Sequence, residues 1–82
     1  MMLKYLILFL ISFELKAYDE NDLLKLINTN ICIKCDLSNA DLGGRNFKGS
    51  NLQGSSLKGS ILIGTDLSYS NLIDVNLSSA FI

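Results

Sequence analysis

Large apolar residues recur at every fifth position from residue 37 to the last residue of the chain. The ten positions are Leu37, Leu42, Phe47, Leu52, Leu57, Leu62, Leu67, Leu72, Leu77 and Ile82. An α-helix turns by about 100° per residue, so a step of five would scatter these side chains around its axis. A flat strand would alternate them between its two faces, because five is an odd step. All ten can point the same way only if the chain turns equally in every repeat, which predicts a solenoid.

The positions around each large residue also repeat. The side chain two residues before it is nearly always small, and the residue directly before it is usually Asp, Asn or Ser. Two residues after it stand mostly Gly, Asn, Asp or Ser, which tolerate tight turns. The pattern therefore favours one turn in each five-residue unit.

In groups of five, residues 35–82 are CDLSN-ADLGG-RNFKG-SNLQG-SSLKG-SILIG-TDLSY-SNLID-VNLSS-AFI. This segment resembles the pentapeptide-repeat family, whose consensus is approximately A-[D/N]-L-x-x. The resemblance implies an all-β solenoid, a right-handed quadrilateral β-helix with four repeats per coil and about two and a half coils. It also implies that the large residue and the small residue two before it point inward. Stacked partners would then be one coil apart, as are Leu37, Leu57 and Leu77.

An apolar segment precedes the repeats. Met1–Phe13 reads MMLKYLILFLISF, with Lys4 as its only charge, and Glu14 closes the apolar run. The run is shorter than the ~20 residues of a membrane-spanning helix. A basic start, a short apolar run and a small residue at Ala17 describe a secretory leader. We predict a signal peptide over residues 1–17 and an exported protein, periplasmic or secreted. The alternative is an uncleaved leader that anchors the protein to a membrane.

A short helical cap is expected within residues 18–34, between the leader and the repeat domain of residues 35–82. Asp19 or Asn21 can serve as its N-cap. Four apolar residues form the face that we expect to be buried: Leu23, Leu24, Leu26 and Ile27. A helix this short is unstable alone in water, so it must dock on the first coil.

Arg45 stands where the pattern places a small inward residue. Burying a guanidinium without a partner is costly. We therefore expect a local bulge that turns it outward or toward the acidic residues of the cap, which are Asp19, Glu20 and Asp22. A binding role for Arg45 is the alternative.

Apolar residues also gather at positions that should face solvent. One coil after Ile61 stands Phe81, with Ile63 and Ile82 close to them. An apolar cluster near the open end of a solenoid suggests a contact surface. We predict an interface at these four residues, for a protein partner or for a second copy that binds through the C-terminal coil. No nucleic acid and no small-molecule substrate is expected there, and a membrane only if the leader is retained.

Cys32-Ile33-Lys34-Cys35 is a CxxC motif at the junction of the cap and the repeats. Four-ligand zinc is implausible with two thiols and no His in the chain. A thioredoxin-like site would need a βαβ context that the pattern lacks. In an exported protein two nearby thiols are expected to form a disulfide. A reduced structural pair is the second interpretation, and a catalytic redox pair is the third.

Composition excludes several classes of function. Seven basic and eight acidic residues give a net charge of −1, which is no electrostatic footprint for nucleic acid. The absence of His removes His-based triads, and no cofactor or metal is expected. We predict a non-catalytic structural or protein-interaction module. One alternative is a DNA-mimic protein that binds a topoisomerase, as the resemblance suggests, although length and charge disfavour it. The other is a CxxC thiol redox protein.

Overall fold

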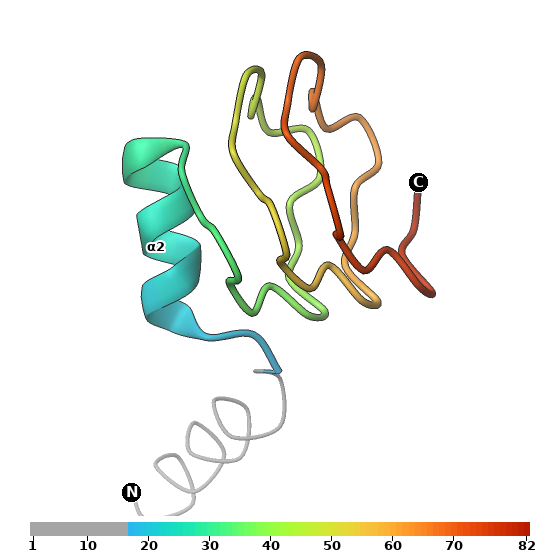
Figure 1. Ribbon diagram of the computed structural model, residues 1–82. Helices are drawn as coiled ribbons and strands as arrows, with labels where there is room; N and C mark the ends of the chain where they lie inside the picture. Colours follow the sequence, from blue (N-terminus) through green and yellow to red (C-terminus); the bar gives the residue numbers. More distant parts are fainter. Residues whose placement is uncertain (1–16) are drawn as a thin grey trace, which may run out of the picture.

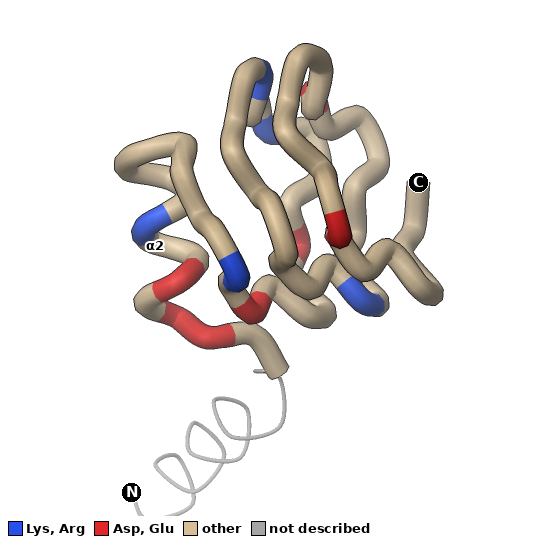
Figure 2. The backbone as a smooth tube through the Cα atoms, viewed as in Figure 1, with Lys and Arg blue, Asp and Glu red and all other residues tan. Residues whose placement is uncertain are grey.

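The computed structural model describes residues 17–82. The predicted leader falls outside this range, apart from Ala17. In this range one helix, α2 (Glu20–Thr29), is followed by a chain that winds back on itself as far as residue 82 (Figure 1). The helix lies beside one end of the stacked coils, and the C-terminus lies at the other end. Charged residues are spread over the helix and the coils and do not gather on one side (Figure 2).

Successive coils are joined by single-residue parallel bridges at intervals of 20 residues. One series joins Ile31 to Asn51 and Asn51 to Asn71, and another joins Asp41 to Ile61 and Ile61 to Phe81. The backbone bonds run in both directions from such a site. The N–H of Leu42 donates to the carbonyl of Ile61 at 2.9 Å, and the N–H of Ile61 donates to the carbonyl of Ala40 at 2.9 Å. Within residues 17–82 no strand extends beyond one bridge, because a turn interrupts the chain in every repeat.

Each five-residue side ends in a turn with one residue in the left-handed region. This residue always stands two positions after the large central residue, with φ between 56° and 73° from Lys34 to Ser79. Glycine fills five of the ten positions, where it avoids the strain that a Cβ brings at positive φ. The same turn is closed by a backbone bond such as Ala40 N–H to the Leu37 carbonyl, at 3.1 Å.

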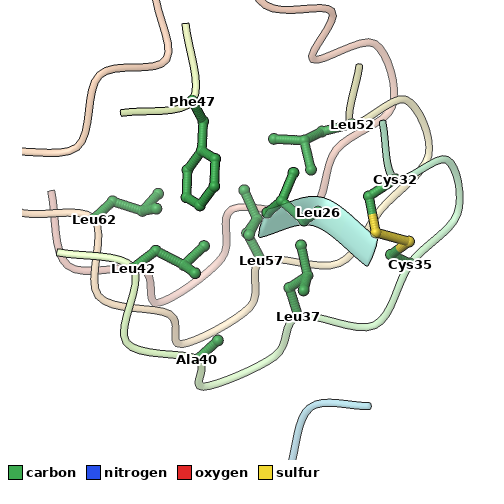
Figure 3. Close-up of a cluster of buried hydrophobic side chains, with 10 residues drawn as sticks. All are labelled: Leu26, Cys32, Cys35, Leu37, Ala40, Leu42, Phe47, Leu52, Leu57 and Leu62. Atoms are coloured by element: carbon green, nitrogen blue, oxygen red, sulfur yellow. A yellow bond between two sulfur atoms is a disulfide. The ribbon is translucent and has the colours of Figure 1, made fainter. Parts of the chain in front are cut away.

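We take the α2 end as the top of the stack. The central residues fill the interior of the upper coils, as Figure 3 shows. Those with less than a tenth of their surface exposed are Leu37, Leu42, Phe47, Leu52, Leu57 and Leu62. The last coil differs from the prediction of a uniform core. Leu67 and Leu72 are half-buried, Leu77 is 37% exposed and Ile82 is 87% exposed. Among the described residues no further coil packs beneath them, so their lower sides stay open.

Small residues two positions before the central ones also point inward, and their hydroxyls bond to the backbone of the coils. The hydroxyl of Ser55 donates to the Cys32 carbonyl at 2.6 Å, and that of Thr65 donates to the Leu42 carbonyl at 2.8 Å. No buried side-chain nitrogen or oxygen of residues 17–82 lacks a partner. The narrow interior therefore tolerates these hydroxyls, because their hydrogen bonds offset the desolvation penalty.

Asp19 caps α2, and its carboxylate accepts the N–H groups of Asn21 and Asp22 at 2.8 and 3.1 Å. Leu26 is fully buried against the first coil and Leu23 packs beside it. The prediction is wrong for the other two apolar residues of the helix, because Leu24 and Ile27 are exposed. Residues three apart share a helix face as readily as residues four apart. The four apolar residues contain two such pairs, Leu23 with Leu26 and Leu24 with Ile27, and only the first pair faces the coil.

The cap replaces part of a missing coil. The carboxylate of Asp22 accepts the N–H of Asp36 at 2.9 Å, and the N–H of Asp19 donates to the Asp36 carbonyl at 3.0 Å. The hydroxyl of Thr29 contacts both backbone groups of Ile31, at 3.1 and 3.0 Å. These are the groups that a coil above would engage. The side-chain amide of Asn30 also donates to the Lys48 carbonyl at 3.0 Å, so α2 and the residues at its ends satisfy two sides of the first coil and part of a third.

The coils begin at Ile31, one repeat before the predicted boundary at residue 35. Cys32 occupies the central position of this first repeat, five residues before Leu37, and is fully buried. Lys34 has the positive φ of the repeat turn.

Candidate functional site

The Asp and Asn residues before the central position are engaged with the backbone. Each accepts the N–H of the residue two positions later, as Asp41 does from Gly43 at 3.0 Å and Asn46 from Lys48 at 3.0 Å. The residues in this arrangement are Asp36, Asp41, Asn46, Asn51, Asp66, Asn71 and Asn76. Sequence reasoning noted the preference but missed its cause, which is a local side-chain turn that Asn and Asp favour.

These contacts assign a structural role to three of the four acidic residues in the repeats. Asp36, Asp41, Asp66 and Asp74 are all exposed and lie on different sides of the stack. The hydroxyl and the N–H of Ser68 donate to Asp66 at 2.5 and 2.9 Å, and they lower the pKa of that carboxyl. The first three serve as turn acceptors, which is a structural role.

On one side of the stack, Asp41 of the first coil is followed in the next two coils by hydrocarbon, where most other repeats carry the turn-forming Asp or Asn. Ile61 and Phe81 occupy this position and are bridged to each other. Ile63 is 62% exposed and Phe81 is 58% exposed. We call Ile61, Ile63 and Phe81 the apolar face. Gly43 lies above it without a side chain, and a Cβ there would be 3.7 Å from Ile61 Cγ2. The structure therefore brings three of the four predicted interface residues together, with Ile82 following Phe81 in the chain.

The C-terminal edge of the stack has unpaired backbone groups. In the coil above, the N–H groups of Leu52 and Leu57 donate to the carbonyls of Asn71 and Asn76 at 3.0 and 2.8 Å. The equivalent N–H groups of Leu67, Leu72 and Leu77 have no partner among residues 17–82. We call this row the C-terminal edge.

Arg45 is exposed, and the expected bulge is absent. The ladder is unbroken there, since Arg45 N–H donates to the Leu42 carbonyl at 3.2 Å and Asp66 N–H donates to the Arg45 carbonyl at 2.9 Å. Among residues 17–82 no coil lies above the first one, so the guanidinium reaches solvent without distorting the backbone. Arg45 lines a cleft of about 520 Å³ at the C-terminal end of α2, whereas the acidic residues of the cap lie in its first turn.

Cys32 and Cys35 are bonded, with an S–S distance of 2.03 Å. Cys32 is fully buried and Cys35 is 4% exposed (Figure 3). The sulfur of Cys32 lies 3.2 Å from the carbonyl oxygen of Asp22 in α2. A redox active site needs an accessible sulfur, so this burial favours a structural role for the pair.

Within residues 17–82, no helix has both the length and the apolar character needed to cross a membrane. The same part of the chain contains no group of three or more Cys, Asp and Glu side chains that could hold a metal ion.

Stacked coils with a buried residue at every fifth position define a class of repeat protein in which each unit is stabilised only by its neighbours. The family model described as pentapeptide repeats, in eight copies, matches residues 40–78. The chain belongs to the pentapeptide-repeat family.

Among solved structures, the chain is similar to the crystal structure of a pentapeptide repeat protein, Rfr23, from the cyanobacterium Cyanothece 51142. The two are 28% identical, with a TM-score of 0.46, over 62% of this chain and 42% of that protein. The chain thus matches less than half the length of this relative. No curated protein matches the chain in sequence.

Proposed function

We propose that the protein is an exported, non-catalytic module that acts by binding another protein, and that the first partner is a second copy of itself. Membership of the family supports a right-handed quadrilateral β-helix for the coils. The interior is filled by Leu, Phe and hydrogen-bonded hydroxyls, which suits a scaffold that binds its partner through its outer surface.

The observation that carries the proposal is the C-terminal edge beside the apolar face. Unpaired N–H groups at Leu67, Leu72 and Leu77 invite pairing with another chain. Ile82 and Phe81 add exposed hydrocarbon at the same end. The last coil carries two charged side chains, Asp66 and Asp74, and residues 75–82 carry none, so the segment with Phe81 and Ile82 can approach its copy without direct charge repulsion. A contact between identical ends closes into a dimer about a twofold axis.

The oligomeric state tests this interface. Light scattering after gel filtration should give twice the chain mass at high micromolar concentration. Phe81→Asp should return the protein to a monomer, because a carboxylate would be buried in the contact. Ile33→Asp is the matched control, since Ile33 is an exposed isoleucine on the first coil, and it should leave the dimer intact. A monomer at this concentration, or a dimer that survives Phe81→Asp, would refute the interface.

Export rests on the leader pattern and is supported by the bonded cysteines, since disulfides persist in oxidising compartments. The intact mass of protein purified from its native host should match a chain that starts near Tyr18. Full-length protein confined to the cytosol would overturn this part of the proposal and leave the interface standing.

A further inference from the structure

α2 and the residues at its ends cover two sides of the first coil and part of a third, where the side-chain amide of Asn30 donates to the Lys48 carbonyl at 3.0 Å. They supply partners to the backbone of Ile31 and Asp36, but the N–H and C=O groups of Asp41 and Asn46 have none among residues 17–82. One coil lower, the equivalent groups are paired, since the N–H of Ile61 donates to Ala40 and its carbonyl accepts from Leu42. We call residues 41–46 the uncovered edge. It lies at the opposite end of the stack from the C-terminal edge.

A cleft adjoins this edge at the end of α2. Its lining combines Ile27–Asn30 of the helix end with Arg45, Asn46 and Phe47 of the first coil. Phe47 is buried and gives the cleft an apolar wall, while Arg45 is exposed. No ion pair of Arg45 is present in the described part of the chain. Between residues 35 and 82 the other nine residues at this position of the repeat are small or apolar, and Asn30 holds it in the repeat of Cys32, so a charged side chain occurs there only at Arg45.

We propose that the uncovered edge and the cleft bind a peptide segment that carries a carboxylate and that turns once, as a repeat of this chain does. Asp41 and Asn46 lie on neighbouring sides of the coil, with the turn at Gly43 and Gly44 between them. The peptide therefore follows the same corner above residues 41–46 and pairs with the free backbone groups of Asp41 and Asn46. Backbone pairing of this kind takes its affinity from main-chain hydrogen bonds and its specificity from side-chain sites. Arg45 supplies the side-chain site, because a guanidinium binds a carboxylate with two parallel hydrogen bonds.

The charges on this edge also fix where the acidic residue must lie. Asp41 is negative and exposed, so a carboxylate directly above it would be repelled. Parallel pairing runs from Asp41 toward Asn46, as it does in the coils below. The acidic residue of the peptide therefore follows the residue paired with Asp41 by about four positions, which brings it over Arg45.

The probe is an acetylated and amidated peptide, Asn-Leu-Ser-Gly-Glu-Asn-Leu-Ser, titrated into the ¹⁵N-labelled protein. The amide signals of Asp41 and Asn46 should shift and their hydrogen exchange should slow. The same peptide with Gln in place of Glu should bind about fivefold more weakly, as expected for an exposed ion pair. Arg45→Ser should remove that difference, and Ser is the natural residue at this position in the next repeat. Lys58→Ser, at an exposed cation of a lower coil, should preserve it.

Three results would overturn the proposal. The first is the absence of shifts at Asp41 and Asn46 with millimolar peptide. The second is equal affinity for the Glu and Gln peptides. The third is slow exchange of both amides before any peptide is added, since another segment of the chain would then already cover the edge.

Discussion

Replacing Leu57 by Ala tests the five-residue phase most directly. Leu57 is fully buried in the middle coil, and its N–H donates to the Asn76 carbonyl at 2.8 Å. Truncating a buried leucine costs about 2–5 kcal/mol, from lost burial and the cavity left behind. A chain of this size has a stability on the order of 4–12 kcal/mol. The variant should therefore lose a large part of its stability and melt on the order of 10–30 °C lower.

Leu77→Ala is the matched control, because Leu77 occupies the same column one coil lower and is 37% exposed. Its truncation should cost about 1–2 kcal/mol, since less surface returns to water and no closed cavity forms. Lys58→Ala, one residue after Leu57 and exposed, should change stability by less than about 0.5 kcal/mol. Circular dichroism during thermal and urea unfolding, at low micromolar concentration, measures all three. Equal losses for Leu57→Ala and Lys58→Ala would refute the assignment of inward and outward positions.

Three further predictions concern the surface and the disulfide. Ile61→Asn should keep or raise the melting temperature, because Asn can accept the Ile63 N–H as Asn46 accepts that of Lys48 at 3.0 Å. The same substitution should weaken self-association, and a lower melting temperature would contradict the turn argument. Ser68→Ala should raise the pKa of Asp66 toward its ordinary value of 3.8, measured by carboxyl ¹³C titration. Because that pKa is lowered in the folded state, the stability that the turn provides is present above pH 3.8 and is lost as the pH falls through the lowered pKa; an unchanged titration would refute the role of the hydroxyl. Mature protein from an oxidising compartment should show no free thiol at Cys32 or Cys35 when denatured without reductant, and quantitative alkylation would refute the bonded pair.

The family assignment made from the sequence is confirmed, because a strict period of five has few structural explanations. The sequence placed the start of the coils one repeat too late. Cys32 holds the central position of the first repeat, but a cysteine is neither large nor diagnostic, so the period is visible only from Leu37 onward. The extra repeat is evident only in the structure, from the bridge between Ile31 and Asn51 and from the positive φ of Lys34.

The bulge expected at Arg45 is absent for a different reason. The pattern treats every repeat as equivalent, so it presents the Arg45 position as enclosed on both sides and a bulge as necessary for an outward side chain. In the structure this position belongs to the first coil, and beside it lies the end of a helix instead of another coil. Repeat position alone therefore does not determine burial at the ends of a stack. The same reasoning accounts for Ile82, which has the central position and yet is largely exposed.

Bridged residues are 20 positions apart, so the side of the stack on which a residue lies is determined by its position in the sequence. An insertion of one complete coil would lengthen the stack and leave α2 and the apolar face on their present sides. An insertion of a single repeat between them would keep every leucine inside, yet rotate Ile61, Ile63 and Phe81 by a quarter turn relative to α2. The angle between α2 and the apolar face is thus set by the number of residues between them, and it can be changed in steps of five residues while the pattern of inward leucines is kept.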